Sequence, residues 1–370
     1  MKHITRRDFI RTASAAFGTA CLTGFAGMAT GVRSAMALSP EEVRIGVVAP
    51  SHCALPMVHA FHTGLLEKAG IRAQIRYMDM HYVAKGLLDG EIDVGQLISP
   101  VFFAVNSGVG PFTGNAKALV TAQIAGTNGG VLVVGNQTGI DEPKHLAGKT
   151  IGVHSPFMVH SLLVNRMFQQ HGIDPSSDIT IKLVHMKYLI PALMRKEIDA
   201  FINPEPLGTF AIKKQAGREL MITKDLWPSH PCCIVAMRKD YFEENPDRAH
   251  ALYGATVKSS IMLNDPAGRE EALARVHRDA RPYSQVPLAA IKKAFRPGRT
   301  DFDPFVYQSS GKAVLSMMQG YGLIHRTADI DTLVSDTFMS GMSRQLMVSA
   351  GAEAPEGDER MEEIVGRAVS

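Results

Sequence analysis

Two adjacent cysteines, Cys232 and Cys233, follow a histidine, His230, in the stretch SHPCCIVAMRKDYFEENP. Thiolates and imidazoles are suitable ligands for copper or zinc, and a thiolate beside a base can act as a nucleophile. A disulfide between neighbouring cysteines would need a strained ring. The stretch therefore leaves open a metal site, a nucleophile, or a position whose role depends on the rest of the chain.

Further residues with metal-binding side chains are scattered over the sequence, and none of them forms a C-x-x-C pair. The candidates for a metal are His52, Cys53, His81, His160, His230, Cys232 and Cys233. An enzyme using Cys233 with His160 or His230 as base has no support beyond residue types. We therefore predict no catalytic residues and no cofactor, and leave a metal open.

The first 37 residues resemble a twin-arginine export signal. Arg6 and Arg7 precede a weakly apolar run, and Ala-Met-Ala at residues 35–37 offers a cleavage site. Lipid attachment at Cys21 stays an alternative. We expect a location in the bacterial periplasm.

Composition points to an ordinary globular protein, with 45% hydrophobic and 20% charged residues among 370. Loss of the export signal removes five basic residues and one acidic residue, which changes the formal net charge from +3 to −1. No basic block remains that would indicate a nucleic-acid partner. The length favours two domains.

Short apolar runs alternate with amphipathic stretches from Val43 onward. VRIGVVAP predicts a buried strand, MVHAFHTGLLEKAG a helix, and AQIRYMDM a second strand. The pattern restarts at GGVLVVG, which predicts two α/β lobes with parallel strands. We assign residues 43–128 plus 230–347 to lobe one, with a helical C-terminal part packing on it. Residues 129–229 form lobe two, and residues 350–370 look like a polar tail.

Two such lobes offer a cleft beyond the carboxyl ends of their strands, and the cleft can close around a small molecule. Together with export, this favours a solute-binding protein over an enzyme.

Four stretches resemble the nitrate/bicarbonate-binding branch of the nitrate/sulfonate/taurine-type ABC transporter substrate-binding proteins. They are LLDGEIDVGQLISPVFFAVNSG, HLAGKTIGVHSPFMVHSLLVNRMFQQHGIDPSSDITIKLV, LMRKEIDAFINPEPLGTFAI and SHPCCIVAMRKDYFEENP. The resemblance implies a type II periplasmic binding protein that delivers its ligand to a membrane permease and ATPase. It also implies a small-molecule ligand, no enzyme activity and a monomeric chain.

The resemblance also points to ligand-binding residues. His160 matches a histidine that reaches the bound anion, and it falls in the first turn of a predicted helix, where an anion is favoured. Gln123 and Asn128 lie in a Gln/Asn-rich segment before the crossing to lobe two, which could equally be a hinge. A surface position is the plainer alternative for His160.

For four other residues the evidence for ligand contact is less direct. His81 and Tyr82 fall where the family has a tryptophan, and a solvated loop is the alternative. His52 follows the first strand and is expected at the cleft mouth. Glu205 matches a Glu-Pro pair, and it either contacts the hinge, a metal or the ligand, or stabilises a helix start.

Cys233 stands where the family has an anion-neutralising lysine. A thiol supplies no fixed positive charge, so the ligand is expected among small anions of the nitrate, bicarbonate or sulfonate type without a single choice. A metal- or metallo-cofactor-binding protein and a ligand sensor remain alternatives. Because side chains alternate along a strand, we expect Cys233 to face the cleft and Cys232 the core, so that they do not bind one ion together.

Overall fold

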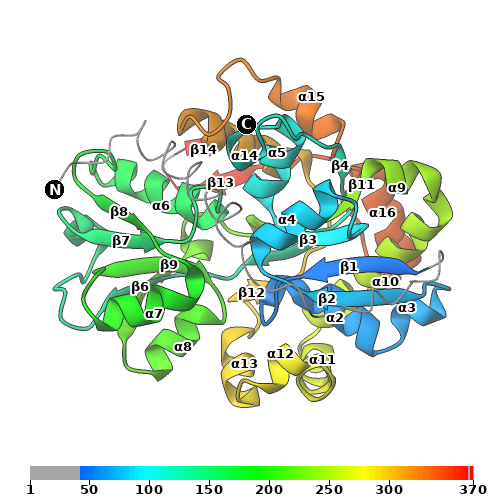
Figure 1. Ribbon diagram of the computed structural model, residues 1–370, viewed down its shortest axis with the longest axis horizontal. Helices are drawn as coiled ribbons and strands as arrows, with labels where there is room; N and C mark the ends of the chain where they lie inside the picture. The colour runs from blue at the N-terminus through cyan, green and yellow to red at the C-terminus, as the bar shows by residue number, and fades with distance from the viewer. Residues whose placement is uncertain (1–41, 366, 370) are drawn as a thin grey trace, which may run out of the picture.

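The computed structural model describes residues 42–365 and 367–369. The predicted export signal at residues 1–37 and Cys21 lie outside the described residues. Two α/β lobes lie side by side, each built on its own sheet (Figure 1). Among the described helices, none combines the length and the apolar character needed to cross a bilayer.

The larger sheet has the strand order β12-β5-β11-β3-β1-β2, with β4 paired to β11. Strands β1, β2 and β3 are parallel, and β11 runs antiparallel to both β3 and β5. The central strands β3, β5 and β11 are almost entirely buried, as expected for strands covered on both faces. The strands are β1 (Val43–Val47), β2 (Ala73–Tyr77), β3 (Val94–Ile98), β4 (Leu119–Val120), β5 (Ile124–Asn128), β11 (Pro231–Arg238) and β12 (Thr300–Asp301).

The second sheet has the order β10-β6-β9-β7-β8. Its strands are β6 (Gly130–Gly135), β7 (Thr150–Val153), β8 (Thr180–Leu183), β9 (Ala200–Pro204) and β10 (Gly217–Ile222). The chain thus passes from one sheet to the other at Gly129 and returns at Pro231. Both predicted α/β units are present, but the expectation of parallel strands is wrong in part, because β11 pairs antiparallel in the first sheet and β6 pairs antiparallel with β9 and β10 in the second.

Helices flank both sheets. In the N-terminal part of lobe one they are η1 (His52–Ala54), α2 (Leu55–His62), α3 (Leu65–Lys68), α4 (Met80–Leu88), α5 (Ser99–Ser107) and η2 (Gly110–Phe112). In lobe two they are η3 (Pro143–Leu146), α6 (Val159–Gln170), α7 (Met186–Met194), α8 (Leu207–Lys213) and η4 (Thr223–Asp225).

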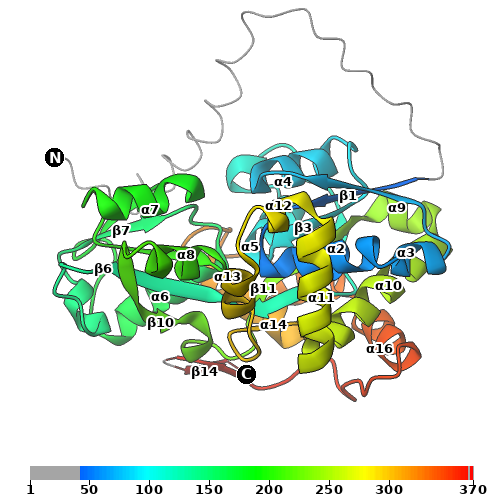
Figure 2. The same ribbon diagram turned by 90° about the horizontal axis from the view of Figure 1, so that it is seen from below.

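The predicted helical C-terminal part consists of α9 (Lys239–Glu244), α10 (Pro246–Asn264), α11 (Pro266–Asp279), α12 (Arg281–Ser284), α13 (Leu288–Ala294), α14 (Gln308–Gly320), α15 (Ile330–Ser335) and α16 (Ser340–Ser349). Helix α10 packs on α2 and α3, and α14 packs on α5, so this part covers lobe one as predicted. Helix α13 also reaches α8 in lobe two (Figure 2).

The stretch from residue 350 is packed against the body, which corrects its interpretation as a polar tail. Arg344 donates to the backbone oxygen of Pro355 and pairs with Asp358. Strands β13 (Glu362–Ile364) and β14 (Arg367–Val369) then form a hairpin. The polar composition indicated a solvated tail. The prediction is wrong because polar groups of this stretch bind partners on the folded body.

Candidate functional site

Three chain segments bring histidines and cysteines together between the two sheets. His52 and Cys53 lie in η1 after β1, and Cys232 lies at the start of β11. His160 comes from the first turn of α6 in lobe two. All four are at most 1% exposed. The sheet order places β1 and β11 on either side of β3, so the fold itself positions this group.

The functional atoms of these side chains are close. The Sγ of Cys53 lies 3.1 Å from Nε2 of His52, and the Sγ of Cys232 lies 3.5 Å from Nε2 of His160. One ligand atom from each of His52, Cys53 and Cys232 lies within 4.8 Å of the others. These residue types at these distances could hold a metal ion.

Two glycines allow the rings of His52 and His160 to lie close to the backbone between the sheets. A Cβ on Gly129 would lie 2.4 Å from a ring carbon of His52, and a Cβ on Gly130 would lie 2.3 Å from a ring carbon of His160. Gly129 also has a φ of 82°, which favours glycine. The Gly-Gly pair between the sheets therefore serves both the crossing and the packing of two cleft histidines.

Cys232, rather than Cys233, makes the contact with lobe two. The pairing of β11 with β5 shifts register on both sides of Cys233, so simple alternation does not hold here. Cys233 instead receives a long hydrogen bond from Nε2 of Gln96, 3.5 Å away. Both thiols also interact with that of Cys53, which contradicts the expectation that one of them turns to a separate face.

Burial governs the ionisation of the histidines. It lowers the pKa of His160 to about 3 and also lowers the pKa values of His52 and His230. These rings are therefore neutral at ordinary pH and bring no positive charge. The Nδ1 atoms of all three lack a hydrogen-bond partner although they are buried.

Burial and mutual hydrogen bonds shift the pKa values of the three thiols in different directions. Burial raises the pKa of Cys53, and the hydrogen bond with Cys233 raises that of Cys232. Burial also opposes ionisation of Cys233, but hydrogen bonds with Cys232, Cys53 and Gln96 outweigh it and lower the pKa of Cys233. One sulfur thus ionises more readily than the others.

The side-chain amide of Gln123 is hydrogen-bonded within lobe one. Its Nε2 donates to Oγ of Ser260 at 3.0 Å, and its Oε1 accepts from Oγ1 of Thr256 at 2.5 Å. Both partners lie on α10, so this side chain anchors the C-terminal helices to β5. Its proposed ligand contact would require these bonds to break.

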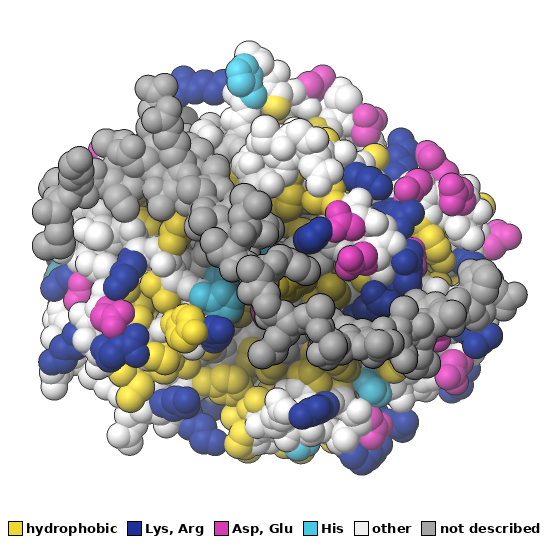
Figure 3. Space-filling model, viewed as in Figure 1, with side chains coloured by type: hydrophobic (Ala, Val, Ile, Leu, Met, Phe, Trp, Pro, Cys, Tyr) yellow, Lys and Arg dark blue, Asp and Glu magenta, His cyan; other side chains and the backbone are white. Residues whose placement is uncertain are grey.

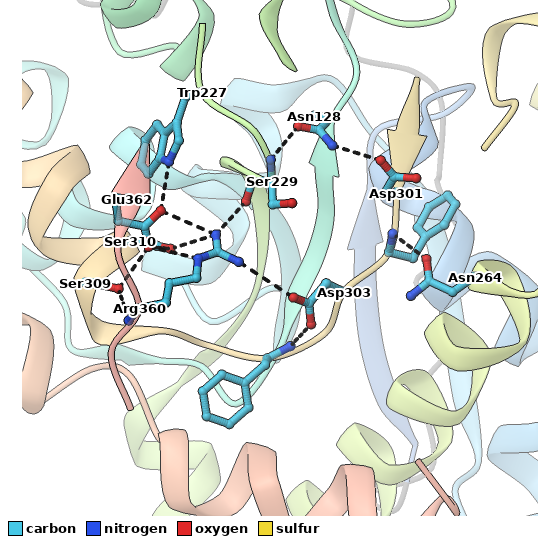
Figure 4. Close-up of polar contacts among 12 residues, drawn as sticks. Asn128, Trp227, Ser229, Asn264, Asp301, Asp303, Ser309, Ser310, Arg360 and Glu362 are labelled. Atoms are coloured by element: carbon cyan, nitrogen blue, oxygen red, sulfur yellow. Dashed lines mark hydrogen bonds and ion pairs between the residues drawn. The ribbon is translucent and has the colours of Figure 1, made fainter. Parts of the chain in front are cut away.

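Asn128 ties together the segments that cross between the lobes. Its Nδ2 donates to Asp301 at 2.9 Å, and its Oδ1 accepts from the backbone N–H of Ser229 at 2.9 Å (Figure 4). Its backbone has a φ of 61°, which asparagine tolerates better than most residues. These contacts are those of a hinge residue, the alternative that the sequence left open.

Glu205 combines two of its predicted roles. It accepts hydrogen bonds from the backbone and the hydroxyl of Thr209 in the first turn of α8. It also forms a buried ion pair with Arg299, whose Nε lies 2.6 Å away. Because Arg299 immediately precedes β12 of lobe one, this pair links the lobes beside the cleft.

His81 and Tyr82 lie at the start of α4, away from the His/Cys group. Tyr82 is 52% exposed, and the two rings are 3.8 Å apart. His81 borders a small cavity of about 30 Å³ together with His154, Ser155 and Phe157 of lobe two. The pair therefore stands where the lobes meet.

A hydrogen-bond network around Glu362 also joins the lobes, and the sequence did not predict it. The carboxylate of Glu362 accepts from Nε1 of Trp227, from Ser309 and Ser310, and from Arg360 (Figure 4). Arg360 also donates to the backbone oxygen of Ser229. No local pattern signals this network, because its members lie far apart in the sequence.

Charges on the visible surface are mixed. Over the lobe-one side of the face in Figure 3, basic and acidic side chains are interspersed. This matches the near-zero charge expected for the chain after loss of its first 37 residues.

Comparison with known proteins places this geometry in a family. The model of the NMT1-like family matches residues 36–277, well over half of the chain. The chain belongs to the NMT1-like family. Its expected membership in the wider nitrate/sulfonate-type group of binding proteins agrees with this match.

Two curated relatives show how far this likeness extends. The nitrate import ATP-binding protein NrtC of Synechocystis sp. is 24% identical over 243 residues, which are 62% of this chain and 36% of NrtC. The chain therefore spans little more than a third of that relative's length. The nitrate/nitrite binding protein NrtA of Synechococcus elongatus is 25% identical over 309 residues, 73% of this chain and 69% of NrtA.

A solved structure decides the fold. The periplasmic nitrate-binding protein NrtA from Synechocystis PCC 6803 superposes with a TM-score of 0.79 at 17% identity, covering 88% of this chain and 94% of that one. The predicted fold class, a two-lobed periplasmic binding protein, is confirmed.

Proposed function

We propose that this family member is the exported solute-binding component of an ABC importer. It captures one small ligand between its lobes and delivers it to a membrane permease and ATPase, without catalysing a reaction. The observation that carries this proposal is the meeting of side chains from both lobes in one buried group, with Cys232 of lobe one beside His160 of lobe two. A clamp needs such contacts on its closing faces.

The relatives support the remaining parts of the proposal. One is named a nitrate/nitrite binding protein and another a nitrate import ATP-binding protein, which supports a small anion as ligand and an ATPase as partner. The name of the solved structure supports a periplasmic location, which the twin-arginine signal would provide. We propose that the chain acts as a monomer.

Ligand-induced stabilisation tests this function. The chain without residues 1–37 is treated with EDTA, and its melting temperature is measured with nitrate, nitrite, bicarbonate and an alkanesulfonate. A ligand at 100 times its Kd stabilises the folded state by about 2.7 kcal/mol, which raises the melting temperature by several degrees. We expect one of these anions to do so.

Two histidine variants make the test specific to the cleft. His160→Ala should abolish the shift, whereas His325→Ala, at an exposed histidine far along the chain, should leave it unchanged. If none of the four anions shifts the melting temperature of the wild-type chain, the small-anion receptor is excluded.

A further inference from the structure

The His/Cys cluster, defined as His52, Cys53, Cys232 and His160, has the composition of a metal site. Two thiols and two imidazoles converge from three separate segments of the chain. Such S₂N₂ sets bind zinc and related ions in a tetrahedral arrangement. We propose that the His/Cys cluster binds a thiophilic cation, Zn²⁺ or Cu⁺, through both sulfurs and both imidazoles.

The observed separations suit this coordination. Metal–sulfur bonds of about 2.3 Å and metal–nitrogen bonds of about 2.0 Å place tetrahedral ligand atoms roughly 3.3–3.8 Å apart. The measured Sγ–Nε2 separations are 3.1 Å for Cys53 with His52 and 3.5 Å for Cys232 with His160. One ligand atom from each of the three lobe-one residues lies within 4.8 Å of the other two. Nε2 of His160 contacts Cys232 but lies outside this group of three, so four-fold coordination requires His160 to move toward His52 and Cys53.

The polar atoms of the His/Cys cluster lack good partners within the protein. Its hydrogen bonds involve sulfur, which is a weak donor and a weak acceptor. Among the described residues, the hydrogen-bond partner of Nε2 in His52 is Sγ of Cys53, and that of Nε2 in His160 is Sγ of Cys232, although both rings are fully buried. Buried polar groups are normally satisfied, and exceptions require an explanation such as an ion.

The ligand types favour a soft cation over a hard cation. Two thiolates neutralise Zn²⁺, so the bound site carries no net charge that burial would penalise. Mg²⁺ and Ca²⁺ prefer oxygen ligands, and the four side chains of the cluster provide none.

A bound ion would join the lobes. His52, Cys53 and Cys232 belong to lobe one, whereas His160 belongs to lobe two. The ion would therefore hold the clamp closed. This step rests on the proposed function, since it takes the space between the lobes as the ligand cleft, but metal binding itself is measured separately.

Cobalt spectroscopy tests the proposal. The reduced chain without residues 1–37 is freed of metal with EDTA, desalted and titrated with Co²⁺, then with Zn²⁺, Mg²⁺ or Cu⁺. We expect a sulfur-to-cobalt charge-transfer band that saturates at one equivalent, is displaced by Zn²⁺ or Cu⁺, and persists in excess Mg²⁺. Absence of the band in the reduced wild-type chain would overturn the proposal.

Paired cysteine variants locate the ion. Cys232→Ser should weaken Co²⁺ binding by more than about tenfold, whereas Cys233→Ser, at the thiol beside Gln96, should retain the band. Circular dichroism checks that both variants fold. The reverse pattern, with binding lost only in Cys233→Ser, would contradict this ligand set.

Different results would exclude the metal site and the small-anion receptor. Anion-induced stabilisation in EDTA without a cobalt band removes the metal site and leaves the solute receptor standing. A cobalt band without any anion response removes the small-anion receptor and leaves the metal site.

Discussion

At the scale of single residues, burial decides what the charged and titratable groups can do. Arg299 and Glu205 have side chains that are 3% and 0% exposed, and they pair across the lobes. Histidines in the interior are held neutral by the same burial. Both effects can be measured without knowing the ligand.

Removal of Arg299 should be strongly destabilising. Arg299→Met leaves Glu205 buried without its cation, which typically costs about 3–5 kcal/mol. Urea unfolding measures this loss. The control is Lys239→Met, which breaks an exposed pair with Glu243 and should cost about 0–1 kcal/mol. Equal losses in the two variants would contradict the structural importance of the buried pair.

His59 should make the folded state sensitive to acid. Burial, followed by the charge of Arg275, lowers its pKa from 6.5 to about 4, and its Nδ1 bonds Oγ of Ser259 at 2.8 Å. The unfolded chain therefore binds the proton more tightly than the folded chain. The stabilisation is complete above pH 6.5 and is lost as the pH falls toward 4, on the order of 2–3 kcal/mol.

Replacement of that histidine tests the sign. In His59→Asn, the free energy of unfolding should fall less steeply between pH 6.5 and 4 than in the wild-type chain. Chemical denaturation at several pH values gives both slopes. Identical slopes would show that His59 does not titrate as its burial requires.

At the scale of elements, the sequence predicted the strands and helices well but missed two features. Alternation along β11 wrongly separated Cys232 from the cleft, because a register shift beside Cys233 depends on pairing with β5. The segment after residue 350 was interpreted as a polar tail, because its partners lie on distant elements. Local pattern predicts elements, whereas pairing partners determine where side chains point.

The C-terminal hairpin offers a direct test of this second feature. Glu362→Ala removes the acceptor of Nε1 of Trp227, 2.8 Å away, and one partner of Arg360. We expect a loss of about 2–3 kcal/mol and a red shift of fluorescence, since Trp227 is the only tryptophan in the chain.

The matched control is Glu363→Ala, whose side chain points to solvent in the same strand. It should change neither stability nor emission. If Glu362→Ala behaves in the same way as this control, the hairpin contributes nothing to the interlobe network.

At the scale of the whole molecule, two lobes and a cleft followed from the alternation of elements and from family resemblance. The sequence predicted the lobes better than it predicted which side chains are free to bind a ligand. Ligand contacts of His160 and His52 stay predictions, whereas Gln123 and Asn128 are bound to protein partners. Their residue types suited a ligand, and only the tertiary contacts reveal that their polar atoms are already used.

Small-angle X-ray scattering tests whether the two lobes close when they capture a ligand. A compact chain of this length without its first 37 residues has a radius of gyration of about 20 Å. Scattering is recorded without additives and with nitrate, bicarbonate, an alkanesulfonate or Zn²⁺ in turn. A solute-binding clamp predicts a smaller radius with at least one of them, approaching the compact value. An unchanged radius in every condition would contradict it.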